Sequence, residues 1–140
     1  RTGQPSTVYF QTYSHNSTMI NDITNKNPNI FLEKEVEIRK KNSLPPFQRF
    51  ISLILTGENE SKLDKEATKF KLFLESKIIG KVLGPVNAPI FRLKGKYRIR
   101  LLIRGPKNLK LQKTLSTLIT KYKFLPGIKL SVDVDPISFN

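Results

Sequence analysis

The arginines of YRIRLLIR, residues 97–104, are the residues of this sequence best placed to do chemistry. Successive side chains of a β-strand point to opposite faces, so Arg98, Arg100 and Arg104 share one face, and most of the apolar residues share the other. A row of cations of this kind is suited to contacts with phosphate groups. The same pattern also fits the solvated face of an ordinary antiparallel strand, where charges discourage further strand pairing. Both interpretations predict a strand with an apolar face and a basic face.

The charge of the whole chain favours a polyanionic partner. With 25 Lys and Arg against 11 Asp and Glu, the 140 residues carry a formal net charge of +14. The segment from Lys77 to Lys129 holds fourteen basic residues and no acidic one. Such a field attracts nucleic acid first and anionic membrane second. A membrane partner is disfavoured, because the basic helix expected over residues 107–122 lacks a broad exposed apolar face.

Three further basic residues surround the turn that precedes this strand. Arg92, Lys94 and Lys96 lie close in sequence to two aromatic residues, Phe91 and Tyr97. Bases stack on exposed rings while cations pair with phosphates, so this turn extends the candidate surface. Core packing is the other interpretation of both rings, and the strand alternation favours it for Tyr97. No aromatic signature of an RNA-recognition motif is present, so base-specific readout is not indicated.

Residues that could carry out catalysis or hold a metal are sparse. The single histidine, His15, lies in a polar turn, and there is no cysteine to complete a nucleophilic site. No glycine-rich phosphate loop is present. Asp133 and Asp135 fall on one face of a strand, which makes a metal pair conceivable, but salt links to the arginine-rich strands are the favoured interpretation. We therefore predict no catalytic residue, no metal site and no cofactor in this chain.

Composition indicates a folded domain in a reducing compartment. Hydrophobic residues make up 38% of the chain, which allows a modest apolar core. The absence of cysteine excludes disulfides and suits the cytoplasm. No apolar run approaches the roughly 20 residues of a membrane span, and no signal-peptide pattern is visible.

Hydrophobic periodicity predicts an α+β domain in the C-terminal two thirds of the chain. The expected elements are strands over 49–55, 82–93, 97–104 and 128–135, with helices over 61–78 and 107–122. The order β-α-β-β-α-β is that of the ferredoxin-like, or split βαβ, fold, in which two helices cover one face of a four-stranded antiparallel sheet. If the apolar face of 97–104 lies under the helices, its arginines point to the open face.

The N-terminal third is expected to be a separate region. Residues 1–18 contain a short strand candidate, VYFQTY at 8–13, and residues 19–46 form a helical connector. The sequence LPPF at 44–47 stops that connector, so we place the start of the C-terminal domain, residues 47–140, at this point.

Several motifs together resemble a known family. They are VYFQTY (8–13), the spacing from Glu35 to Arg39 that leads into LPPF (44–47), VLGPVNAPIFRLKGKYRIRLLI (82–103) and the closing DVDP (133–136). In these segments the chain resembles the C-terminal end of the bacterial primosomal protein N′ (PriA) family, the ATP-dependent DNA helicases of replication restart. The resemblance implies that residues 1–18 are the tail of the second helicase lobe and that 47–140 bind DNA and partner proteins.

The resemblance also implies what belongs to a longer protein. Because the chain begins at Arg1 rather than Met, we expect it to be part of one. Arg1 would be the last arginine of a helicase motif, normally facing the ATP γ-phosphate. The nucleotide-binding and zinc-binding segments of the family precede the matched region. ATP, Mg²⁺ and zinc are therefore implied for the full-length protein, and no ATP hydrolysis or unwinding is expected of this chain.

In the family, the C-terminal domain binds single-stranded and branched DNA and helps to form a pocket for the acidic tail of single-stranded DNA-binding protein. That pocket uses an arginine and a glutamine at the start of the last helix. Gln112 matches the glutamine, Asn108 stands at the arginine position, and Lys107 or Lys110 would supply the charge. The DNA-backbone surface is predicted to comprise Arg92, Lys94, Lys96, Arg98, Arg100 and Arg104.

Alternatives to a DNA-binding part of the primosome remain open. An RNA-binding or ribosome-associated module is the main one, because it can use the same ferredoxin-like fold and the same charge. A free-standing enzyme that processes phosphate compounds is the other, and turnover of acyl phosphate or ATP would reveal it. For Arg92 and Arg98, a structural role bracing the turn is an equal interpretation.

Overall fold

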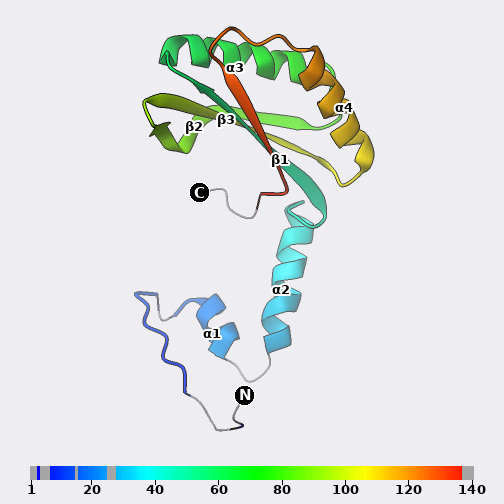
Figure 1. Ribbon diagram of the computed structural model, residues 1–140. Coiled ribbons are helices and arrows are strands. Elements are labelled where there is room, and N and C mark those ends of the chain that lie inside the picture. The colour runs from blue at the N-terminus through cyan, green and yellow to red at the C-terminus, as the bar shows by residue number, and fades with distance from the viewer. Residues whose placement is uncertain (1–2, 4–6, 15, 25–27, 137–140) are drawn as a thin grey trace. The chain divides into compact units, whose positions relative to one another are not determined.

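The computed structural model describes residues 3, 7–14, 16–24 and 28–136, and the chain divides into two units, Arg1–Ile38 and Arg39–Asn140 (Figure 1). In order, the elements are α1 (Thr18–Thr24), α2 (Pro28–Lys41), β1 (Gln48–Gly57), α3 (Glu60–Glu75), β2 (Lys81–Leu93), β3 (Lys96–Pro106), α4 (Leu109–Lys121) and β4 (Lys129–Val134). The division falls inside α2, before the LPPF segment at 44–47. The domain boundaries at 18 and 46 stay predictions.

The second unit is built around one sheet. Within the described residues it has four strands in the order β2-β3-β1-β4, and each neighbouring pair is antiparallel. This order, with β1 and β3 in the centre, is that of the split βαβ arrangement. The predicted α+β class is confirmed, as are the four strands and two helices that were expected after residue 47.

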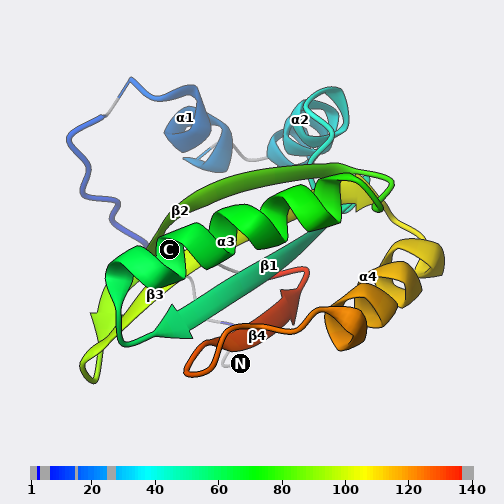
Figure 2. The same cartoon turned by 90° about the horizontal axis from the view of Figure 1, so that it is seen from above.

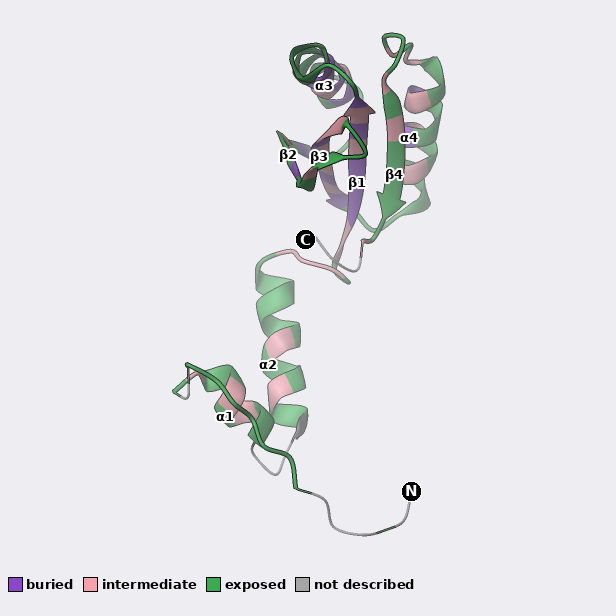
Figure 3. Cartoon of the chain, turned by 60° about the vertical axis from the view of Figure 1, so that its left-hand side comes forward, coloured by how far each residue is buried: buried purple, intermediate pink, exposed green. Residues whose placement is uncertain are grey.

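The core lies between the sheet and its two helices, α3 and α4, and Figure 3 shows the buried segments facing one another. From the sheet, Ile51, Leu53, Leu55, Ile99, Leu101 and Ile103 are at most 2% exposed. From the helices, Leu63, Phe70, Leu74, Leu111, Leu115 and Leu118 join the same cluster. Alternate residues of β1 and β3 point to one face, so both helices cover that face. Figure 2 shows α3 running along the sheet, and neither α3 nor α4 covers the opposite face.

An aromatic cluster and a buried acid connect α3 to the segment after α4. Phe70 lies with its ring centroid 4.7 Å from that of Tyr122 and 4.8 Å from that of Phe124. Glu66 is only 3% exposed, and its carboxylate accepts a hydrogen bond from the Leu125 N–H at 3.4 Å. Burial, the nearby Glu66 charge and a hydrogen bond to Glu66 raise the pKa of Tyr122 to about 12. These contacts hold the turn that leads into β4.

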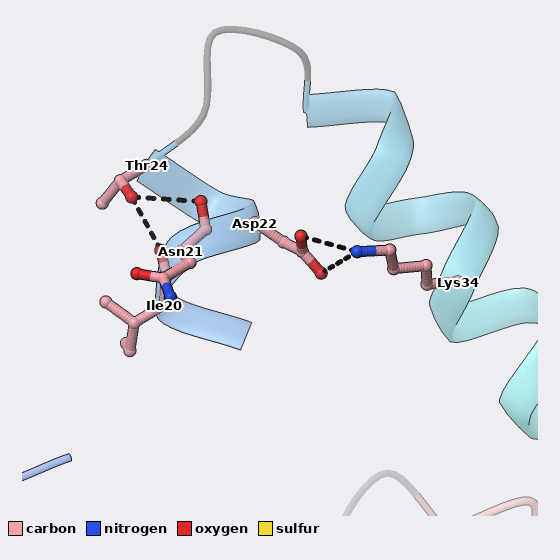
Figure 4. Close-up of polar contacts among 5 residues, drawn as sticks. All are labelled: Ile20, Asn21, Asp22, Thr24 and Lys34. Atoms are coloured by element: carbon pink, nitrogen blue, oxygen red, sulfur yellow. Dashed lines mark hydrogen bonds and ion pairs between the residues drawn. The ribbon is translucent and has the colours of Figure 1, made fainter. Parts of the chain in front are cut away.

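The first unit contains α1 and the first part of α2. An ion pair joins the two helices, with Lys34 Nζ 2.8 Å from an oxygen of Asp22 (Figure 4). The Thr24 hydroxyl donates to the carbonyls of Ile20 and Asn21 at 2.9 and 3.1 Å, which satisfies backbone acceptors at the end of α1.

The strand predicted at residues 8–13 is wrong. This segment forms neither helix nor strand, and Val8, Tyr9, Phe10 and Tyr13 are exposed. A strand needs a neighbour for its backbone hydrogen bonds, and no strand of the described residues pairs with it. Nor is any helix in the described ranges both long and apolar enough to cross a membrane.

Candidate nucleic-acid interface

The arginines of β3 lie on the sheet face opposite to α3 and α4. Residues directly opposite one another in an antiparallel pair project to the same face. Arg98 lies opposite Thr56 and Arg100 opposite Ile54 on β1, whereas the alternate residues of β3 are buried under the helices. The alternation in YRIRLLIR therefore predicted the open face correctly. We call the side of the sheet opposite to α3 and α4 the open face.

Further cations on the open face come from the outer strands. Lys81 of β2 lies opposite Arg104, and Lys129 of β4 lies opposite Thr56. An acid is also present, because Asp133 of β4 lies opposite Ser52. Apolar residues lie among the cations, namely Leu83 and Val86 on the outer strand β2, Leu102 on β3 and Ile54 on β1. The open face thus combines cations on central and outer strands with apolar residues between them, and the acid Asp133 lies on an outer strand.

Arg98 and Arg104 each donate a hydrogen bond to another residue of the sheet. Arg104 Nε donates to Gln48 Oε1 at 2.7 Å, and Arg98 Nη1 donates to the carbonyl of Ile90 at 3.4 Å. Ile90 lies in the irregular stretch of β2 between Asn87 and Arg92, where the register with β3 shifts. These bonds support the bracing role for Arg98 without excluding phosphate contacts, because an arginine has five N–H donors.

The turn between β2 and β3 places three basic side chains around one hollow. Lys94 and Gly95 have φ values of 49° and 79°, the positive values that a tight two-residue hairpin turn of type I′ needs. Lys94, Lys96 and Arg98 line this hollow, with Thr56, Leu93 and Ser131 completing it. The predicted residues Lys94, Lys96 and Arg98 are thereby brought together at one end of the open face.

Arg92 does not join this group. It lies opposite Tyr97, which shares the helix-side face of β3 with Ile99 and packs against the core. Its guanidinium carbon is 5.2 Å from the centroid of the Tyr97 ring, and the Phe91 ring is 5.4 Å from the same ring. Such a cation–π contact stabilises the end of the hairpin. The structure therefore separates Arg92 from Arg98, although the sequence places both near the same turn.

The predicted partner-binding residues lie around α4 but in two different places. Lys110 lines a hollow with Lys77, Ile79, Pro106, Asn108, Leu111 and Thr114. Gln112 lines a separate groove between α4 and β4, with Ile51, Leu115, Ser116, Ile119, Thr120, Val132 and Val134. Lys107 is exposed just before the helix. Lys110 and Gln112 thus line different hollows.

Asn108 has a structural task at the start of α4. It is the N-cap residue, and its side-chain oxygen accepts a hydrogen bond from the Leu111 N–H at 3.0 Å. This bond satisfies one of the free N–H groups of the first helical turn. An asparagine just before a helical apolar pattern is a sequence signal for a cap. Because asparagine is neutral, this position provides no cation for an acidic tail.

The closing DVDP segment ties the end of β4 to β1. Asp135 lies beyond β4 with a φ of 54°, and its N–H donates to the Phe50 carbonyl at 2.7 Å. Its carboxylate accepts from the Phe50 N–H at 3.3 Å and lies 3.2 Å from Arg49 Nε. Asp135 thus forms a salt link with an arginine, but this arginine is Arg49 of β1 and not one of the arginine-rich strand β3. The parts of the chain that the structure describes hold no cluster of three or more His, Cys, Asp or Glu side chains. Arg1 and His15 lie outside them.

Comparison with known proteins assigns this domain to a family. The family model of the primosomal protein N C-terminal domain matches residues 40–137. The replication restart protein PriA of Rickettsia felis is 36% identical over 132 residues, which are 94% of this chain and 20% of that protein. PriA of Thermotoga maritima is 31% identical over 134 residues (96% and 17%), and PriA of Bacillus subtilis is 26% identical over 138 residues (95% and 17%).

These matches define the class of the protein. The chain belongs to the primosomal protein N C-terminal domain family, as its motifs indicated. It spans a fifth or less of the length of these three relatives, between 17% and 20%.

Proposed function

We propose that the open face binds the sugar-phosphate backbone of single-stranded and forked DNA, as one part of a replication-restart protein. The observation that carries this proposal is the placement of Arg98, Arg100 and Arg104 on the face that the helices leave uncovered. The segment from Lys77 to Lys129 contains no acidic residue, so negative charges near this face, such as Asp133 on β4 and Glu58 next to Lys96, come from other segments. Contacts of this type position a nucleic acid without reading its sequence, which suits recognition of a fork by its shape.

The names of the relatives support the biological setting. Proteins 26–36% identical to this chain are called replication restart protein PriA. We infer that the full-length protein is a cytoplasmic, ATP-dependent helicase that assembles the primosome at stalled forks. ATP, Mg²⁺ and zinc would be bound by parts of that protein outside this chain, and the chain by itself would not hydrolyse ATP.

The test is binding of this chain to a forked DNA, measured by fluorescence anisotropy at one low salt concentration. The variant Arg98→Ala/Arg100→Ala/Arg104→Ala is expected to bind roughly tenfold or more weakly, because it loses three cations from the proposed contact surface. The matched control Lys62→Ala/Lys65→Ala/Lys69→Ala removes the same charge from exposed positions of α3 and should bind nearly as the original chain does. If both variants lost the same affinity for forked DNA, the effect would come from net charge alone, which would contradict the proposal.

Competition separates DNA from RNA as the polyanion. An unlabelled forked DNA should displace the labelled fork at lower concentration than an RNA of the same length and shape. Stronger displacement by the RNA would favour the alternative, an RNA-binding or ribosome-associated module on the same fold.

We also propose that the start of α4 contacts the acidic tail of single-stranded DNA-binding protein. The support is the row of exposed lysines on this helix, together with Gln112 at the matching family position. A labelled peptide of that tail should bind this chain. Because Gln112 and Lys110 line different hollows, Gln112→Ala and Lys110→Ala tell which hollow takes the peptide. Unchanged affinity in both variants would place the tail elsewhere.

A further inference from the structure

The hollow at the β2–β3 turn has the composition of an anion site. Its volume is about 390 Å³, and its lining residues are Thr56, Leu93, Lys94, Lys96, Arg98 and Ser131; we call it the hairpin hollow. Three cations come from the hairpin, while the two hydroxyl groups come from β1 and β4. Segments far apart in the sequence therefore supply charge and neutral hydrogen-bond donors to one place.

The cross-strand register explains why these donors meet. Thr56 lies opposite Arg98 on one side and opposite Lys129 on the other, so the three side chains form a row across β3, β1 and β4. Ser131 lies two residues from Lys129 on the same face. Because the hydroxyls are carried by paired strands, their positions are fixed before a ligand arrives, which lowers the entropy cost of binding.

An acidic residue of the same chain, Glu58, lies beside this site. Glu58 Oε1 lies 3.5 Å from Lys96 Nζ, and the Glu58 side chain is 79% exposed. Exposed ion pairs contribute little free energy, so an incoming anion can replace this carboxylate at small cost. Glu58 therefore competes weakly for Lys96 in the free protein.

We propose that the hairpin hollow binds one phosphate group of a DNA strand together with its sugar. Lysine and arginine neutralise the phosphate, the Thr56 and Ser131 hydroxyls donate hydrogen bonds to its oxygens, and Leu93 contacts the sugar. The volume exceeds that of a phosphate alone, which leaves room for the attached sugar. This inference rests on the proposed DNA binding and adds a specific phosphate site to it. A diffuse basic surface would need no hydroxyl groups, whereas this site uses two.

The test uses a change that leaves the charge untouched. In Thr56→Val/Ser131→Ala the cations remain, so a diffuse surface would keep its affinity for single-stranded DNA, whereas a built phosphate site loses two donors. We expect binding to weaken roughly tenfold, with an unchanged thermal midpoint. The control Ser61→Ala/Thr68→Val makes the matching changes at exposed positions of α3 and should have no effect. Glu58→Gln should bind about twofold more tightly, because the competing carboxylate loses its charge.

The outcomes separate this inference from the proposed function. If the original chain binds DNA but Thr56→Val/Ser131→Ala binds equally well, the hairpin hollow takes no phosphate and only the basic surface stands. If the original chain binds no DNA, both proposals fall. Oligonucleotides with a 5′-phosphate or a 5′-hydroxyl identify the phosphate. If Thr56→Val/Ser131→Ala loses more affinity for the 5′-phosphate strand than for the 5′-hydroxyl strand, the hollow binds a terminal phosphate. If it loses equal affinity for both strands, the hollow binds an internal phosphodiester.

Discussion

The two faces of β3 differ in what they do for the molecule. On one face, Ile99, Leu101 and Ile103 are at most 2% exposed and form the core with α3 and α4. On the other face, Arg98, Arg100 and Arg104 are partly accessible beside β1 and β2. One face of β3 therefore stabilises the fold, and the other face provides the proposed DNA contacts. Substitutions on the two sides should have separable effects.

The largest expected effect is on the core face. Leu101→Ala leaves a cavity beneath the helices and should lower the free energy of unfolding by about 2–5 kcal/mol. Urea unfolding followed by circular dichroism measures this loss. Under conditions where the variant is still folded, its affinity for DNA should be unchanged. A weakened affinity in the folded variant would mean that the two faces are coupled.

A smaller effect should appear when the arginines keep their charge but lose their geometry. Arg98→Lys/Arg104→Lys loses the bonds to Ile90 and Gln48, so the free energy of unfolding should fall by about 1 kcal/mol or less. DNA binding should stay within about threefold of the original, since a lysine still neutralises a phosphate. If the lysine variant lost as much DNA affinity as the alanine variant, the arginines would act through bracing or bidentate hydrogen bonds and not through their charge alone.

The helix-covered side also predicts how stability depends on pH. The pKa of Tyr122 is raised to about 12, so the folded state favours the neutral phenol. Its contribution to stability is complete below about pH 10, the ordinary tyrosine pKa, and is lost as the pH rises towards 12. The difference in unfolding free energy between the original chain and Tyr122→Phe should therefore shrink or change sign over this range. A difference that is constant from pH 8 to 12 would contradict the assignment to Tyr122.

The smallest effect is expected where β4 ends. Asp135→Ala removes the contacts to Arg49 and to the Phe50 N–H, and should cost about 0.5 kcal/mol because the pair is partly exposed. The backbone bond from residue 135 to Phe50 can persist. Thermal unfolding measures the change, and Asp133→Ala serves as the comparison on the neighbouring acid. Equal effects of both variants would argue against a specific role of Asp135.

Much of the C-terminal fold could be predicted because its local patterns agree with its tertiary structure. The alternation in YRIRLLIR placed the arginines on the open face, and the hydrophobic periodicity over 61–78 predicted the helix that is α3. VYFQTY failed for the opposite reason. Its residues favour a strand, but a strand forms only with a partner that supplies backbone hydrogen bonds.

The candidate site was harder to predict than the fold because it depends on register. Thr56, Ser131 and Lys129 carry no signal of their own in the sequence, and they join Arg98 only through the pairing of β1 with β3 and β4. Arg92 was grouped with Arg98 because the two are close in sequence. The pairing of Arg92 with Tyr97 places it on the other face. Such positions become visible only when the neighbouring strands are aligned.

The central claim is that phosphates contact the open face, and the salt dependence of DNA binding tests it most directly. The affinity of this chain for a single-stranded DNA is measured over several salt concentrations, beside Arg98→Ala/Arg100→Ala/Arg104→Ala. Each phosphate contact contributes about 0.7 to the slope of log affinity against log salt for a single strand. We expect the slope of the variant to be smaller in magnitude by about 2. An unchanged slope, with the fold intact by circular dichroism, would contradict the claim and leave these arginines a structural role only.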